Sequence, residues 1–178
     1  KVWREYKKNL KSSLAEYSLG EKKNNYYMAL DGKTGINCFD DWVKELKSYG
    51  YLHNHSRMWF ASIWIHTLQL PWELGANFFL KNLIDGDPAS NTLSWRWVAG
   101  LHTQGKCYLA SEDNIEKFSN GRYSQKNILN KQIKVPVFQS FMFEKKEYNS
   151  QKISKKNNLI LLNINNLSYL DETLEIMK

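Results

Sequence analysis

Residues 52–58 read LHNHSRM, and residues 85–97 read DGDPASNTLSWRW. Asp87 followed by Pro88 predicts a helix start, because an aspartate side chain caps free backbone N–H groups and proline suits the first helical turn. The earlier stretch opens a second helix, 54–69, in which apolar residues recur at helical spacing. Both helices therefore begin with polar side chains and continue into apolar sequence.

The polar residues of these two stretches are candidates for one site. Arg57 on an otherwise apolar helix is costly to bury unless a carboxylate pairs with it, and Asp85 and Asp87 are the available partners. With Asn91, one turn into the later helix, they could bind a flat heterocycle that presents hydrogen-bond donors and acceptors. The alternative is an internal arginine–aspartate bridge beside a capped helix, and the pattern by itself favours this structural interpretation.

Hydrophobic periodicity predicts further helices in the first 130 residues. Apolar residues share one face of 39–49, and Gly50 suits the position after its last turn. Residues 20–25 form a polar break, and the Lys- and Asn-rich stretch 145–158 has the composition of a linker. The apolar run 157–163 has the length of a strand. The helices expected are 2–17, 39–49, 54–69, 71–84, one from Pro88 onward and a short one at 112–118.

Length and composition describe one domain with a tail. The chain has 178 residues, of which 42% are hydrophobic and 24% charged, enough to bury a sizeable core. No run reaches the roughly 18 apolar residues that a membrane helix needs, so we expect no membrane association. Cys38 and Cys107 make no disulfide framework. The expected fold class is all-α over 1–128, with an α/β or irregular extension over 129–178.

The net charge of +7 favours phosphate-bearing partners, because neutralising phosphates releases counterions. Many of the lysines, however, lie in Lys-Asn stretches that an AT-rich genome would also produce. Charge alone therefore leaves nucleic-acid binding open.

Signatures of common enzyme classes are missing from the sequence. His53, His55, His66 and Cys107 lack the ligand spacings of a zinc site, so we expect no metal. A Gly-x-Ser-x-Gly nucleophile elbow and a Gly-x-x-x-x-Gly-Lys phosphate loop are also absent.

Three tryptophans near the polar stretches allow two interpretations. Trp95 and Trp97 are two residues apart and so point to different sides of a helix, and Trp72 lies in the preceding helix. Large aromatic side chains usually fill cores. Neighbouring indoles can also pass electrons, which aliphatic side chains cannot do, and composition does not separate these interpretations.

Taken in order, several motifs closely resemble the photolyase/cryptochrome family. They are Lys33-Thr34-Gly35, Asp40, residues 52–58, residues 85–91 and Trp95-Arg96-Trp97, and the opening Trp3-Arg4-Glu5 resembles a helix beside that family's lesion pocket. The resemblance covers residues 2–123 and is to the C-terminal half of an all-helical domain that holds FAD in a bent conformation. It implies FAD as cofactor and leaves the antenna chromophore open.

The resemblance also implies roles for individual residues. Arg57 and Asp85 would pair beside the isoalloxazine ring, and both Arg57 and Trp95 would be buried or nearly so. Asn91 would face flavin N5 and reorient its amide with the redox state. Trp95 would be the flavin-proximal member of a photoreduction chain and Trp72 the middle one, while Tyr26 or Tyr27 could replace the missing surface member. The implied catalytic residues are Trp95, Trp72, Asn91 and Met58; the FAD contacts are Arg57, Asp85, Gly86, Asp87, Asn91 and Asn54; the DNA contacts are Trp3, Arg4, Asn54, His55 and Met58.

The function implied is light-driven repair of cyclobutane pyrimidine dimers in DNA, by a cytoplasmic, bacterial-type, monomeric lyase. Met58 is the discriminating residue, since members that repair the other lesion type place His there. Two alternatives stay open: a cryptochrome-like photoreceptor without repair activity, and a flavin-free helical module. The family's antenna domain and the earlier part of its FAD site have no counterpart in this sequence, so we expect the chain to be part of a longer polypeptide.

Overall fold

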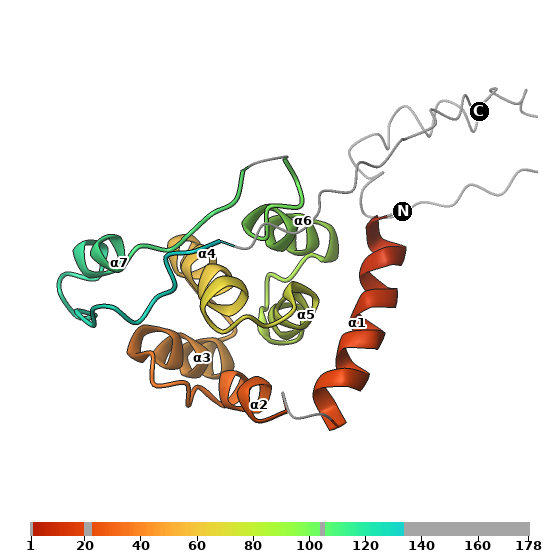
Figure 1. Cartoon of the computed structure of the whole chain (residues 1–178), viewed down its shortest axis with the longest axis horizontal. Coiled ribbons are helices and arrows are strands. Elements are labelled where there is room, and N and C mark those ends of the chain that lie inside the picture. The colour runs from red at the N-terminus through yellow and green to blue at the C-terminus, as the bar shows by residue number, and fades with distance from the viewer. Residues whose placement is uncertain (1, 20–22, 104–105, 134–178) are drawn as a thin grey trace, which may run out of the picture. The chain divides into compact units, whose positions relative to one another are not determined.

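The computed structural model describes residues 2–19, 23–103 and 106–133, and within these ranges the chain forms helices and no strand (Figure 1). The all-α expectation is confirmed. The strand-like run 157–163 lies outside the described residues. The helices are α1 Val2–Leu19, α2 Lys23–Asp31, α3 Asn37–Tyr49, α4 Asn54–Ser62, the π-helix η1 Ile63–Thr67, α5 Trp72–Asn82, α6 Pro88–Val98 and α7 Glu112–Phe118.

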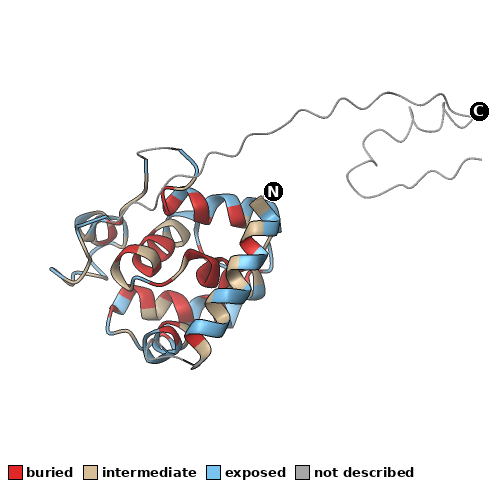
Figure 2. Cartoon of the chain, turned by 45° about the vertical axis from the view of Figure 1, so that its right-hand side comes forward, coloured by how far each residue is buried: buried red, intermediate tan, exposed pale blue. Residues whose placement is uncertain are grey.

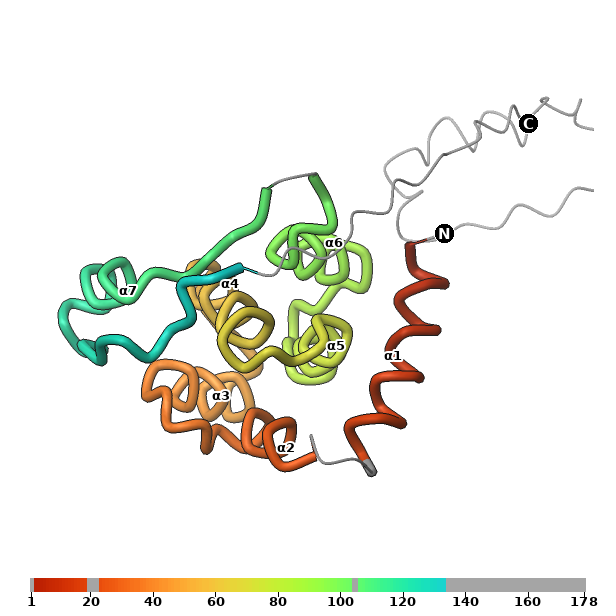
Figure 3. Tube along the Cα trace, viewed as in Figure 1, coloured from red at the N-terminus to blue at the C-terminus, as the bar shows by residue number. Residues whose placement is uncertain are grey.

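The helices pack around α4, η1 and α5. Helix α5 packs against α6 on one side and α1 on another, and α4 runs on into η1 and also contacts α6. The path of the chain brings α2 and α3 to one end of this group, with α7 at the far side from α1 (Figure 3). No described helix is both long enough and apolar enough to cross a membrane.

The expected helix 54–69 is present but changes its winding. From Ile63 to Thr67 the helix widens into a π-helix, in which Leu68 N–H donates to Ile63 C=O over 2.9 Å. Gln69 then takes a left-handed backbone conformation with φ 53° and ends the helix. Such π turns occur often beside functional sites.

The polar break expected over residues 20–25 is shorter than expected, because α2 already begins at Lys23. Tyr26 and Ala29, three residues apart, are buried, and the Tyr26 ring lies against Trp64 with 6.1 Å between centroids. A short helix with a weak local pattern is thus stabilised by tertiary packing, which local sequence does not report.

Two helix ends follow the sequence signals. Asp87 caps α6 by accepting a hydrogen bond from Ser90 N–H over 2.7 Å, and Pro88 is the first helical residue. Gly50 ends α3 with φ 66°, a left-handed conformation that glycine adopts at little cost.

The end of α5 departs from the prediction. Helix α5 ends at Asn82, two residues earlier than expected, because Ile84 N–H donates to Gly50 C=O instead of continuing the helix.

The core is aromatic and lies between α3, α4, η1, α5 and α6. Figure 2 shows the buried residues turned inward on these helices. Stacked, tilted or edge-on ring pairs connect neighbouring members with 4.3–6.4 Å between centroids. The aromatic residues joined in this way are Phe39, Phe60, Trp64, Phe78, Phe79 and Trp95.

Candidate functional site

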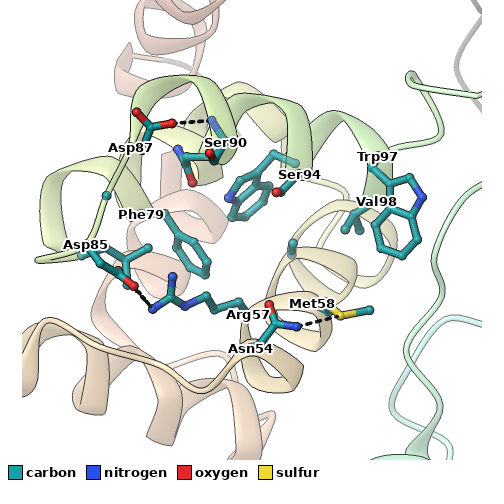
Figure 4. A pocket seen from close by; sticks show the side chains of 15 residues that line it. Asn54, Arg57, Met58, Phe79, Asp85, Asp87, Ser90, Ser94, Trp97 and Val98 are labelled. Atoms are coloured by element: carbon teal, nitrogen blue, oxygen red, sulfur yellow. Dashed lines mark hydrogen bonds and ion pairs between the residues drawn. The ribbon is translucent and has the colours of Figure 1, made fainter. Parts of the chain in front are cut away.

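A cavity of about 270 Å³ lies between α4, the loop after α5, and α6. Helix α4 contributes residues at positions i, i+3, i+4 and i+7, and α6 contributes a second helical face. Figure 4 shows the lining side chains converging from both helices and from the loop. Among the sequence-predicted residues, the cavity brings together Asn54, Arg57, Met58, Asp85, Gly86, Asp87, Asn91, Trp95 and Trp97.

Arg57 and Asp85 form a two-pronged ion pair at this cavity. Arg57 Nη2 donates to Asp85 Oδ1 over 3.1 Å and to Oδ2 over 2.8 Å. Arg57 Nε donates to Leu52 C=O over 2.7 Å, which fixes the guanidinium plane, and the Tyr51 ring lies 5.1 Å from Arg57 Cζ. Figure 4 shows the two side chains pointing toward each other. The pair joins the start of α4 to the loop between α5 and α6.

Arg57 is only partly buried, at the more exposed limit of what was expected. Its side chain is 24% exposed and that of Asp85 is 53% exposed, because Asp85 lies in a loop open to solvent. Exposed pairs contribute about 0.2–1 kcal/mol, so the roughly 3–5 kcal/mol lost on breaking a buried pair does not apply here. The pair orients groups at the cavity more than it stabilises the fold.

Asn91 is held in one orientation. Its Nδ2 donates to Ala76 C=O in α5 over 2.8 Å. A backbone carbonyl can only accept, so this contact fixes which end of the amide is nitrogen. Asn91 Oδ1 is then the atom left to accept a hydrogen bond from a bound molecule.

Asp87 and Asn54 contribute to the cavity through local structure. Hydrogen bonds from the backbone and hydroxyl of Ser90 lower the pKa of the Asp87 carboxyl, so this residue is a firmly charged cap. Asn54 begins α4 after His53, and its Nδ2 lies 3.9 Å from Met58 Sδ (Figure 4). Asn54 and Met58 thereby occupy the same end of the cavity.

Trp95 forms the buried wall and Trp97 an open edge. Trp95 is 2% exposed, which confirms the expectation that it is buried. Trp97 is 37% exposed and stacks on Tyr108 with 5.6 Å between centroids. The two-residue spacing places them on different sides of α6, as expected.

Four predicted residues lie away from the cavity lining. Trp3 and Arg4 are on α1, where Trp3 stacks on Tyr6 with 5.0 Å between centroids. Trp72 in α5 contacts the same Tyr6 at 5.5 Å. His55 stacks on Trp59 at 5.4 Å and faces Phe118 of α7.

Sequence reasoning missed several lining residues. Ser90 and Ser94 share a face of α6 with Trp97, at helical spacings of four and three residues, so the periodicity around Asn91 could have found them. Phe79 and Leu83 come from α5 and its end, and no motif points to them. Among the described residues, no group of three His, Cys, Asp or Glu side chains is placed to hold a metal ion.

Comparison with protein families finds one matching model, described as the FAD-binding domain of DNA photolyase, over residues 2–151. Curated relatives named deoxyribodipyrimidine photo-lyase include one from Agrobacterium fabrum, 33% identical over 111 residues, covering 56% of this chain and 23% of that protein. One from Streptomyces griseus is 44% identical over 72 residues, covering 40% and 16%. One from Escherichia coli is 38% identical over 78 residues, covering 44% and 16%.

Among solved structures, the chain is similar to a bacterial class III photolyase from Agrobacterium tumefaciens. The TM-score is 0.52 at 31% sequence identity, and the match covers 61% of this chain and 23% of that one. The chain therefore spans between 16% and 23% of the length of these relatives.

Proposed function

The chain belongs to the family of the FAD-binding domain of DNA photolyase, and on that premise we propose that it forms the flavin-ring side of the site in a light-dependent deoxyribodipyrimidine photolyase. The observation that carries the proposal is the meeting of a two-pronged Arg57–Asp85 pair, an oriented Asn91 and a buried Trp95 around one cavity. These residues come from two separate stretches of the sequence, 52–58 and 85–97. If the Arg57–Asp85 pair served only to stabilise the fold, neither the cavity nor the oriented Asn91 amide would be needed.

The residues of the cavity fit a flavin ring by their hydrogen-bonding chemistry. An isoalloxazine edge presents carbonyl oxygens and ring nitrogens, which need donors and acceptors side by side. Arg57 supplies donors, Asp85 and Asn91 Oδ1 supply acceptors, and Phe79 and Trp95 supply apolar walls. When bound, FAD would supply the electron that light drives onto the substrate.

The chain's own residues would then bind the flavin ring and orient it. Asn91 Oδ1 would accept from a protonated ring nitrogen, since Ala76 C=O holds the amide nitrogen away. This departs from the expectation of an amide that reorients freely, and it favours the reduced, protonated form of the ring. Arg57 and Asp85 would hold the polar edge of the ring through the loop that they join to α4.

The proposed substrate is DNA that contains a cyclobutane pyrimidine dimer. A dimer in duplex DNA must leave the stack to reach a pocket. Asn54 and Met58, at one end of the cavity, would meet it there, and Trp3, Arg4 and His55 are proposed as further DNA contacts. We also propose that the protein is a monomer and that it acts in the cytoplasm, where it would meet its DNA substrate.

The test uses the protein encoded by the complete open reading frame, loaded with FAD, reduced and given a thymine-dimer oligonucleotide under blue light. We expect thymine absorbance to return. Asp85→Asn removes the charge that holds Arg57, so it should lower FAD content and repair with little change in melting temperature. Asp31→Asn is the matched control, because Asp31 is 54% exposed, pairs with Lys33 and Lys47, and lies on α2 away from the cavity.

The outcomes separate the alternatives. FAD uptake and photoreduction without restored thymine would favour the photoreceptor function over repair. Absence of FAD uptake by the parent protein would defeat the flavin site itself.

A further inference from the structure

A second cavity, the η1 cavity, lies beside η1 and the start of α5. Its volume is about 360 Å³, within the range of small-molecule sites. Its lining comes from α1, η1, the start of α5, the residue after α6 and residues 130 and 132. It shares no lining residue with the cavity proposed for the flavin ring, and the proposed function gives it no role.

His66 gives the η1 cavity a hydrogen-bond acceptor on a side chain that is only 4% exposed. Its Nε2 lies 3.2 Å from Val98 C=O, and because a carbonyl can only accept, Nε2 carries the ring proton. Burial lowers the pKa of His66 below its ordinary 6.5, so the ring is neutral at pH 7 and Nδ1 keeps its lone pair. Within the described part of the chain, no hydrogen bond joins Nδ1 to another residue. A donor on a bound molecule would satisfy this acceptor.

Asn130 holds one wall of the η1 cavity in place. Its Nδ2 donates to His66 C=O over 3.1 Å, and its backbone N–H donates to Thr67 Oγ1 over 3.2 Å. Its Oδ1 accepts from Gln132 N–H over 2.9 Å. These bonds fix residues 130–132 against η1, so the wall is formed before any molecule binds.

Gln69 lies at the rim of the η1 cavity in a strained backbone conformation. Its φ of 53° is in the left-handed region, which few residues other than glycine adopt. Such strain collects at ligand-binding positions, and the π-helix that precedes Gln69 is also common beside functional sites. The exposed Gln69 amide can both donate and accept a hydrogen bond.

The remaining lining favours a flat, uncharged molecule. Ile65, Leu70 and Pro71 supply apolar walls, and Trp72 supplies an indole that is 8% exposed. An aromatic ring packs well against an indole, either offset or edge-on. None of the described lining residues is Asp, Glu, Lys or Arg, so a charged molecule would lose hydration here without a partner of opposite charge.

We propose that the η1 cavity binds a flat, uncharged nitrogen heterocycle whose ring N–H donates to His66 Nδ1. The ring of this molecule packs against Trp72, and the Gln69 amide bonds its polar edge at the rim. The site is separate from the flavin ring and from the DNA contacts, so this inference goes beyond the proposed function and does not rest on it.

Two probes that differ in one donor test the proposal. Benzimidazole is a flat two-ring heterocycle with a ring N–H, and 1-methylbenzimidazole carries a methyl group in place of that hydrogen. Both are uncharged at pH 8. In calorimetric titrations of the protein encoded by the complete open reading frame, we expect benzimidazole to bind and 1-methylbenzimidazole to bind about tenfold more weakly, because the His66 acceptor then lacks a donor. No binding of benzimidazole, or equal binding of both probes, would overturn the proposal.

Two variants locate the probe. His66→Phe keeps a flat ring and removes the acceptor, so the preference for benzimidazole over its methylated form should disappear. Gln69→Gly keeps the test valid if His66→Phe unfolds, because glycine adopts the left-handed conformation without strain. It should keep or raise the melting temperature while it weakens benzimidazole binding about threefold, the loss expected for one hydrogen bond.

Each variant has a matched control outside the η1 cavity. Asn120→Gly makes a similar exchange at an exposed residue with φ 52°, and His102→Phe repeats the histidine exchange at an exposed position. Both controls should bind the two probes as the parent does. Parent-like binding by Gln69→Gly, or an unchanged preference in a folded His66→Phe, would place the probe elsewhere and overturn the proposal.

Titrations with and without bound FAD keep this inference apart from the proposed function. The affinity for benzimidazole should be the same in both forms, since the two cavities share no lining residue. Loss of benzimidazole binding on loading with FAD would place the probe in the flavin-ring cavity and overturn the η1 site. If the protein takes up no FAD, the proposed function fails, while benzimidazole binding still decides for or against the η1 cavity.

Discussion

At Trp95, one substitution separates the packing role of the side chain from its proposed role in electron transfer. Trp95→Phe keeps a buried aromatic ring against Phe60 and Phe79, so the loss in stability should be modest, about 1–2 kcal/mol. Phenylalanine is much harder to oxidise than tryptophan. We expect FAD content and melting temperature to survive largely while blue-light bleaching of oxidised FAD, with an external reductant, collapses.

Trp97→Phe is the matched control for that measurement. Trp97 lies on the same helix and lines the same cavity, but its ring is partly exposed and stacks on Tyr108. Its replacement should leave bleaching near the parent rate. Normal bleaching in Trp95→Phe would instead make Trp95 a packing residue without an electron-transfer role.

At the level of elements, the contact between α5 and α6 depends on Gly75. Glycine inside a helix usually costs about 0.5–1 kcal/mol relative to alanine, so Gly75→Ala would stabilise an isolated α5. Here the added Cβ would lie 2.3 Å from the Trp95 ring, and overpacking of a core costs about 1–3 kcal/mol. We expect a lower melting temperature; a higher one would show that the ring can move aside.

The junction of η1 with the end of α6 should be sensitive to pH. His66 is buried, and its Nε2–H donates to Val98 C=O over 3.2 Å. Burial lowers the pKa of His66 below its ordinary 6.5, although the Val98 contact opposes the shift. The unfolded chain therefore takes up the proton more readily, so stability is full above pH 6.5 and falls as the pH drops toward the pKa of the folded state.

The measurement is the melting temperature as a function of pH in His66→Gln, which keeps a donor for Val98 but does not titrate. The fall in melting temperature below pH 6.5 should become shallower than in the parent. His102→Gln, at an exposed histidine, should leave the slope unchanged. An equal slope in all three proteins would exclude His66 as the group responsible.

At the scale of the whole molecule, the net charge of +7 predicts salt-sensitive binding to DNA. Each phosphate neutralised by Lys or Arg releases counterions, so affinity for plain duplex should fall steeply between low and moderate salt. A titration of fluorescent duplex at several salt concentrations measures this slope. A flat response would mean that the lysines lie away from the DNA, as the genome-composition interpretation holds.

Much of the fold could be predicted from the sequence because its signals are local. Asp87-Pro88 predicts the start of α6, Gly50 the end of α3, and residues 112–118 form α7 as expected. Helix capping and hydrophobic periodicity depend on residues within one or two helical turns, so both can be recognised in the sequence. Periodicity predicted the fold class, the need of Arg57 for a carboxylate partner linked the two polar stretches, and the resemblance supplied the other residues expected at the site.

Other features were decided only by tertiary structure. Helix α2 exists because Tyr26 packs on Trp64, and that partner lies 38 positions away in the sequence. The exposure of Arg57, the fixed amide of Asn91 and the contact of Trp95 with Trp64 also depend on where neighbouring helices lie. Burial and ring contact are properties of packed surfaces, and the order of residues along one chain does not state which surfaces meet.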